Sequence, residues 1–204
     1  MEAATQPGAS RERGLSGIKA VRIVEAMRAS VATRGIAGST FDAVAGAAGV
    51  SRGLLHYYFG TKERLLIEVV RREAEVRTER LEQAIEAAPD AETVLDALVG
   101  SFEDWLGDAP APVMIYEMLT LAQRNEEIAG ELALLGRRTR SHLAEALERK
   151  QRGGVLALRV DPELAAMFLF ALADGVIVRR LSEPELDIGP LTEQAILAAR
   201  AVLS

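Results

Sequence analysis

Residues 40–59 read TFDAVAGAAGVSRGLLHYYF, and they predict two short helices joined by a tight turn. The turn is expected at Ala48-Gly49-Val50, because glycine adopts left-handed backbone angles at little cost. Ser39 or Thr40 can cap the first helix and Ser51 the second, since hydroxyl side chains are favoured at helix N-termini. Small residues before the turn allow the helices to approach closely. This is the anatomy of a helix-turn-helix.

The rest of the 204-residue chain predicts further helices and no strand pattern. Ala, Leu, Glu and Arg dominate, and all four favour helices. Gly and Pro fall mostly between the apolar periods, where they separate one helix from the next. We expect an all-α fold of nine helices. Their expected ranges are 18–34, 40–49, 51–59, 61–88, 91–106, 113–124, 127–151, 161–181 and 191–204.

Composition excludes several classes of protein. With 49% hydrophobic and 26% charged residues the chain is typical of a globular protein. It has no cysteine, which excludes disulfides, thiolate metal sites and a cysteine nucleophile. Its most apolar run, residues 164–178, is 15 residues long and includes Asp174, so it is too short to span a membrane. No secretory signal is visible, and we expect a cytoplasmic protein without membrane contact.

The charge is divided unevenly along the chain. A formal net charge of −6 argues against a nucleic-acid partner. Residues 1–65, however, hold nine Lys and Arg against five Asp and Glu, a net of +4, whereas residues 66–204 have a net of −10. A basic end joined to an acidic body is expected when one end faces a phosphate backbone. Residues 1–15 predict a disordered basic arm, or a segment without function.

Residues 23–66 read IVEAMRASVATRGIAGSTFDAVAGAAGVSRGLLHYYFGTKERLL. The Ala48-Gly49-Val50-Ser51 turn, the closing Phe59 and the Lys62-Glu63 pair that opens the next helix are specific in combination. Together they resemble the DNA-binding domain of the tetracycline-repressor (TetR) family of bacterial transcription regulators. Farther on, Ala173-Asp174-Gly175 resembles family members with a choline-regulator-like C-terminal domain. The resemblance implies a helix-turn-helix domain over residues 16–65 and a helical ligand-binding and dimerisation domain over residues 66–204.

The resemblance also implies which residues meet DNA. Thr40 would donate to a phosphate at the N-terminus of its helix, and Lys62 would bind a second phosphate. Arg52 lies in the first turn of the second helix, where it would read a guanine or bind a phosphate. Gly53 would let the backbone approach the groove closely.

The later residues of the second helix are expected in two different environments, the DNA-facing surface and the core. Tyr57 lies at a position that touches DNA in relatives. His56 stands where many relatives have Tyr, and it is either a DNA contact or a solvated side chain. Leu55, Tyr58 and Phe59 are expected in the core.

Five of the nine aromatic residues lie beyond residue 66 and predict either a ligand cavity or an ordinary core. The cavity would lie between the helices expected at 91–106, 113–124, 127–151 and 161–181, and it would hold a largely apolar effector. The candidate ligand-binding residues are Phe102, Trp105, Met114, Tyr116, Met118, Phe168 and Asp174. The candidate polar anchors are Tyr116, Arg124, His142 and Asp174.

The helix expected at 161–181 is apolar on nearly every face, so it must be covered on all sides. Pairing it and the last helix with their copies in a second chain would bury it in a four-helix bundle. A two-fold dimer also suits a palindromic DNA site.

The sequence therefore predicts a dimeric regulator, most often a repressor in this family, that a small molecule releases from a palindromic operator. No catalytic, phosphate-loop or metal spacing is present, so neither an enzyme nor a cofactor is expected. The alternatives are a helical interaction protein and a constitutive regulator without an inducer.

Overall fold

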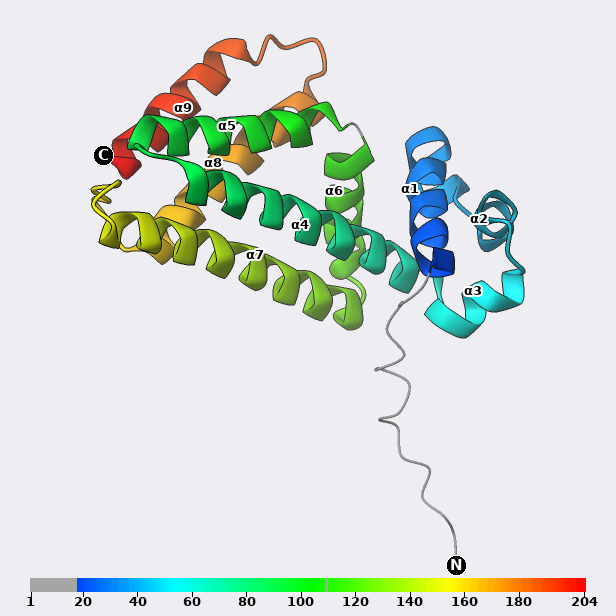
Figure 1. Ribbon diagram of the computed structural model, residues 1–204. Helices are drawn as coiled ribbons and strands as arrows, with labels where there is room; N and C mark the ends of the chain where they lie inside the picture. Colours follow the sequence, from blue (N-terminus) through cyan, green and yellow to red (C-terminus); the bar gives the residue numbers. More distant parts are fainter. Residues whose placement is uncertain (1–17, 109) are drawn as a thin grey trace, which may run out of the picture. The chain divides into compact units, whose positions relative to one another are not determined.

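The computed structural model describes residues 18–108 and 110–204, and these form nine α-helices and no strand (Figure 1). The predicted all-α class is thereby confirmed. The arm predicted at residues 1–15 lies outside the described residues. The helices are α1 (Ile18–Gly38), α2 (Phe41–Ala48), α3 (Arg52–Phe59), α4 (Lys62–Ala87), α5 (Ala91–Gly107), α6 (Pro110–Ala122), α7 (Glu126–Arg152), α8 (Pro162–Ser182) and α9 (Gly189–Leu203).

The chain divides into two compact units, residues 1–69 and 70–204. The division falls four residues after the boundary expected from the sequence. Because α4 runs from Lys62 to Ala87, this one helix contributes to both units.

The first unit contains α1, α2, α3 and the start of α4. Its first helix is interrupted at Gly35, whose φ of 69° and ψ of 173° are not helical. The regular part of α1 therefore ends where the glycine predicted it would. The largest fully buried side chains of this unit are Ile23, Met27, Leu55, Leu65 and Leu66.

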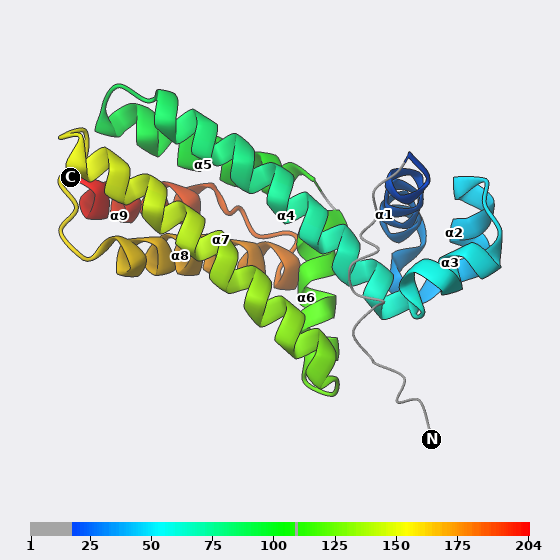
Figure 2. The same cartoon turned by 60° about the horizontal axis from the view of Figure 1, so that its bottom comes forward.

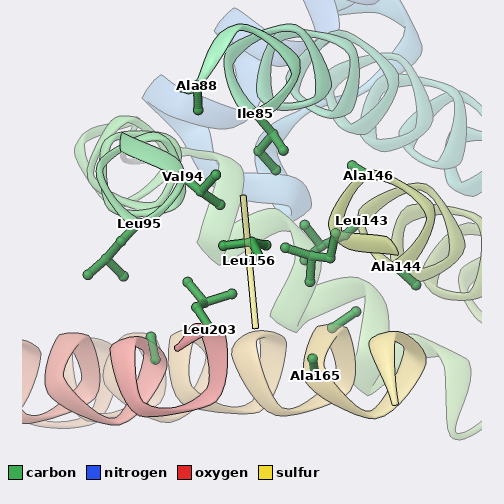
Figure 3. Packing of buried hydrophobic residues seen from close by; sticks show 13 residues of the cluster. Ile85, Ala88, Val94, Leu95, Leu143, Ala144, Ala146, Leu156, Ala165 and Leu203 are labelled. Carbon is green, nitrogen blue, oxygen red and sulfur yellow. The ribbon is translucent and has the colours of Figure 1, made fainter. Parts of the chain in front are cut away.

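The second unit is a bundle of helices around its own core. Within it, α7 packs along α8, α8 along α9, and α5 against α6 and α9 (Figure 2). Val94 of α5, Leu143 of α7 and Leu203 of α9 point into one interior around Leu156 (Figure 3). Leu156 belongs to the segment that follows α7. This segment is hydrogen-bonded to the end of α9, because Ala157 N donates to Leu203 O at 3.3 Å.

The start of α6 differs from the prediction. The sequence placed it at residue 113, because Pro110 and Pro112 were expected to break the chain. Both prolines instead lie in the first turn of α6. The first four N–H groups of a helix have no partner within it, so a proline there removes no helical hydrogen bond.

Candidate DNA-binding surface and ligand cavity

The turn between α2 and α3 is built by Gly49. Its φ of 63° and ψ of 41° are left-handed, and its N–H donates back to Ala45 O and Gly46 O. The Arg22 guanidinium of α1 closes the same end, because its Nη2 donates to Ala48 O at 2.6 Å. The turn thus has both the backbone angle and the carbonyl partners that end a helix and start the next one.

Both helices of the motif are capped by the hydroxyls that the sequence indicated. Thr40 Oγ1 accepts from Ala43 N at 3.3 Å, and Ser51 Oγ accepts from Leu54 N at 3.3 Å. Each hydroxyl accepts with its oxygen, so its own O–H remains able to donate. Thr40 is exposed at the N-terminus of α2, where the helix dipole favours an anion.

Arg52 is exposed at the start of α3 and forms an ion pair within the motif. Its Nη1 lies 3.1 Å from Asp42 Oδ2, and its Nε lies 3.4 Å from His56 Nε2. The His56 ring also meets Phe41 edge to face, with the ring centroids 4.7 Å apart. A pair this exposed contributes little stability, so the guanidinium can exchange Asp42 for another acceptor at small cost.

Lys62 has a structural partner as well as a charge. Its Nζ donates to Ile36 O at 3.0 Å, which satisfies a carbonyl in the last turn of α1. Gly53 has ordinary surroundings, because a Cβ built there would meet only Ser51 Oγ at 4.0 Å. The fold of the first unit therefore does not itself require a glycine at position 53.

The tyrosines of α3 differ from their neighbours. Leu55 and Phe59 are buried, as predicted, whereas Tyr57 is 65% exposed and Tyr58 42% exposed. The prediction that Tyr58 belongs to the core is wrong. Its ring lies beside Tyr57, with the centroids 5.3 Å apart, so two aromatic rings lie together on the exposed face of α3.

The second unit contains a cavity of about 150 Å³ between α4, α5, α7, α8 and α9. Most of its wall is aliphatic or aromatic, with Phe102 and Trp105 from α5 and Phe170 from α8. The polar residues in the wall are Arg77, Thr78, Ser101, Thr139 and Thr192. An apolar cavity of about this volume accommodates a ligand roughly the size of benzene.

Two family models match the chain, and together they cover most of it. Residues 23–69 match the model of "Bacterial regulatory proteins, tetR family", and residues 89–204 match that of "Tetracyclin repressor-like, C-terminal domain". The chain belongs to the TetR family. It is a DNA-binding transcription regulator with a helix-turn-helix, and its relatives are transcription regulators rather than enzymes.

Individual TetR-family relatives match over most of their length. The HTH-type transcriptional regulator BetI of Rhizobium meliloti (strain 1021) is 30% identical over 189 residues, which cover 91% of this chain and 87% of that protein. A TetR transcription regulator from Haloarcula marismortui has a TM-score of 0.73 at 22% identity, covering 91% and 98%. The transcriptional regulator FadR from Bacillus subtilis, in complex with stearoyl-CoA, has a TM-score of 0.70 at 22% identity, covering 90% and 99%. At these identities the two structures show the fold.

The cavity of this TetR-family chain includes two of the seven predicted ligand residues, Phe102 and Trp105. The sequence placed the cavity against the helix that is now α6, but α4 and α9 supply walls and α6 does not. Met114 and Met118 of α6 are fully buried in the core instead, and Phe168 of α8 is 40% exposed.

The predicted polar anchors also lie elsewhere, since none of the four lines the cavity. The Tyr116 hydroxyl donates to the main-chain oxygen of Asp174 at 3.3 Å. Desolvation, followed by the charge of Asp174, raises the pKa of Tyr116 to about 12. His142 Nδ1 lies 3.3 Å from Glu82 Oε1 on a partly exposed surface. Arg124 is exposed in the turn after α6.

Among the described residues one charged side chain lines the cavity, Arg77 of α4, and the sequence did not predict it. Its guanidinium carbon lies 5.0 Å from the centroid of the Trp105 ring. Burial lowers the pKa of Arg77, while the charges of Glu73 and Asp108 raise it. Arginine still remains protonated in proteins. Only its place one helical turn before Leu81 on the apolar side of α4 hinted at burial.

The described ranges 18–108 and 110–204 contain neither a membrane-spanning helix nor a cluster of metal ligands. No helix there is long and apolar enough to cross a membrane. The same residues contain no group of three or more His, Asp or Glu side chains placed to hold a metal ion.

Proposed function

We propose that this TetR-family regulator is a dimeric repressor that a small, largely apolar molecule releases from a palindromic operator. The observation that carries the proposal is the course of α4. This helix begins at Lys62, directly after the helix-turn-helix, and its later residues Arg77, Thr78 and Leu81 line the cavity. A ligand in the cavity therefore contacts the same helix that follows the DNA-reading motif.

The effector acts by binding one arrangement of the two units better than the other. A ligand with equal affinity for both arrangements shifts nothing, however tightly it binds. Movement of α4 upon ligand binding would change the distance between the two helix-turn-helix units of the dimer and so lower the affinity for the operator. Release then depends on the differential affinity of the effector for the two arrangements, and operator binding weakens effector binding by the same factor.

On the operator, we assign α3 to the major groove. Arg52 reads a guanine or binds a phosphate, and Gly53 allows close approach of the backbone. Tyr57 and His56 extend the contact along α3, where both side chains are exposed. Thr40 and Lys62 bind phosphates on either side, and the basic balance of residues 1–65 supports this placement.

We place the dimer interface on α8 and α9. Both helices leave large apolar side chains exposed, which is the usual mark of an interaction surface. On α8 these are Leu164, Met167, Phe168, Val178 and Leu181, and on α9 they are Leu191 and Leu197. Pairing with the same helices of a second copy would cover them. It would also give the two-fold symmetry that a palindromic operator requires.

The cavity favours a ligand-responsive regulator over a constitutive one. The structure of FadR from Bacillus subtilis, which has a similar fold, contains stearoyl-CoA, a ligand with a long hydrocarbon chain and a charged headgroup. In this chain a space lined by apolar side chains within the body is the corresponding feature.

The experiment is selection of bound duplexes from random DNA, followed by titration of the selected duplex at about 150 mM salt, which is near physiological ionic strength. We expect a palindrome, a specific complex that is far tighter than that with random DNA, and affinity that falls steeply with salt. Compounds are then screened for release of the complex. Equal binding of selected and random duplexes would contradict the proposal and leave a helical interaction protein.

A further inference from the structure

Two residues with hydrogen-bond donors lie side by side in the wall of the cavity. Arg77 of α4 and Trp105 of α5 both line the cavity, and the guanidinium carbon lies 5.0 Å from the centroid of the indole ring. Guanidinium and indole groups are donors only and have no acceptor. This part of the wall therefore calls for an acceptor on the ligand.

The indole N–H of Trp105 adds a second, independent observation. Its Nε1 is buried and donates no hydrogen bond to any residue that the structure describes. A buried donor without a partner costs roughly 1–3 kcal/mol, so such groups in native proteins call for an explanation. Trp105 lines the cavity, so a small movement of its side chain would let a ligand oxygen accept from this N–H.

The charge of Arg77 narrows the class of ligand. It is the only charged residue among the described residues that line the cavity. Burial lowers the pKa of its guanidinium, which reflects the cost of desolvating the charge, and Glu73 and Asp108 compensate in part. Neither carboxylate lines the cavity. An anion inside the cavity would relieve the remaining cost, whereas a cation would add to it.

Two of the four hydroxyls in the wall already have partners. Thr139 Oγ1 donates to Leu135 O at 3.0 Å, and Thr192 Oγ1 donates to Ile188 O at 2.9 Å. Both O–H groups are thus used within their own helices. The remainder of the wall is mainly aliphatic and aromatic, and suits a hydrocarbon body.

We propose that the effector is an apolar monocarboxylate, with its carboxylate bound by the Arg77 guanidinium and the Trp105 indole N–H and its hydrocarbon body in the remaining cavity. The inference rests on the proposed function, because it names the ligand class of the same cavity. A quaternary ammonium such as choline is disfavoured for two reasons. Its positive charge would lie near that of the guanidinium, and Arg77 already occupies the face of the Trp105 ring.

The test measures ligand binding calorimetrically on the full chain without DNA. The probes are benzoate, phenylacetate and octanoate, with phenylacetamide as the neutral isostere of phenylacetate and choline as the cation. We expect at least one carboxylate to bind, phenylacetate to bind better than phenylacetamide, and choline not to compete. No binding of any of the three carboxylates at millimolar concentration, or tighter binding of choline, would overturn the inference.

Variants of the wall separate recognition from folding. Arg77→Met should weaken carboxylate binding by about ten- to a hundredfold, which is the effect of one or two charged hydrogen bonds, and should weaken phenylacetamide binding by much less. Arg77→Lys should restore part of the affinity, and Trp105→Phe should weaken it by less. The matched control is Arg80→Met, an exposed arginine of the same helix outside the cavity. Unchanged carboxylate affinity in Arg77→Met would overturn the inference.

Failure of the proposed function and failure of the carboxylate inference give different results. If carboxylates bind and Arg77→Met abolishes their binding, the ligand class stands even when no operator is found. If the protein binds a palindrome and a compound of another class releases it, the proposed function stands and the carboxylate inference is overturned.

Discussion

The two units of the chain present their candidate functional residues in opposite surroundings. In the first unit the residues proposed to contact DNA are mostly exposed and lie close together in sequence, from Thr40 to Lys62. In the second unit the cavity is built from five helices, and its wall is apolar apart from Arg77 and a few hydroxyls. A surface that reads DNA can be encoded by a short motif, whereas a ligand cavity depends on packing between distant segments.

The largest expected effect is a loss of operator affinity when the dimer interface of the second unit is broken. Leu197→Glu places a charge on α9 at a position 50% exposed, within the proposed interface. We expect a monomer, and a loss of operator affinity on the order of 10²- to 10⁴-fold because two linked binding events become independent. Sedimentation and fluorescence anisotropy measure the two effects.

The control for this change is Leu119→Glu on α6, at a side chain 47% exposed. It adds the same charge at a similar exposure outside α8 and α9, and should leave the dimer intact. A Leu197→Glu protein that sediments as a dimer would place the interface elsewhere.

A second change tests the body as a folded unit. Met118 is fully buried, so Met118→Ala should lower the free energy of unfolding by about 2–5 kcal/mol. Urea denaturation measures the loss. The exposed neighbour Leu119, changed to Ala, should cost no more than about 0.5 kcal/mol. Because Met118 does not line the cavity, effector affinity of the folded variant should be unchanged, and a large fall in it would return Met118 to the ligand site.

The third change acts on the first unit only. Arg52→Ala should weaken operator binding by about 1–3 kcal/mol for each half-site if the guanidinium reads a guanine. It should also relax sequence preference at one position. If the guanidinium binds a phosphate, affinity falls uniformly across sequences and the salt slope decreases by about one. Duplex selection with the variant protein distinguishes the two.

Arg152→Ala is the matched control, because Arg152 is an exposed arginine of α7 in an ion pair with Glu148. Arg52 is a sharper target than Lys62, since Lys62 Nζ also donates to Ile36 O and its loss would affect folding. Full operator affinity and unaltered sequence preference in Arg52→Ala would remove it from the interface.

The contrast between the units also explains how far the sequence could be interpreted. Thr40, Ser51, Gly35 and Gly49 are local signals, because each residue makes its cap or turn within a few positions of itself. Predictions from them agree with the structure. Tyr58 was wrongly predicted in the core because it stands among apolar neighbours on a helix only eight residues long. On such a helix adjacent residues lie on different faces, and only one face is buried.

The cavity shows the opposite case. Phe102 and Trp105, which line the cavity, were named from the sequence because aromatic residues are scarce in this chain, which has nine of them. Arg77 gave little signal, since an arginine on a charged helix is usually solvated. The walls are formed by α4 and α9 rather than α6, which depends on which helices pack against one another. Hydrophobic periodicity along one helix does not contain this information.

The smallest expected effect tests whether the turn between α2 and α3 needs a glycine at position 49. Gly49→Ala puts a side chain at a φ of 63°, which costs about 1–2 kcal/mol, and its Cβ would lie 2.7 Å from the Arg22 Nη2 that caps α2. Gly46→Ala lies three residues earlier in the same helix, with nothing within 4 Å of the added carbon. It should stabilise the unit by roughly 0.5–1 kcal/mol, because alanine loses less conformational freedom than glycine in a helix. Thermal unfolding of the two variants should therefore shift in opposite directions. A stabilised Gly49→Ala would mean that the turn between α2 and α3 does not need its left-handed glycine.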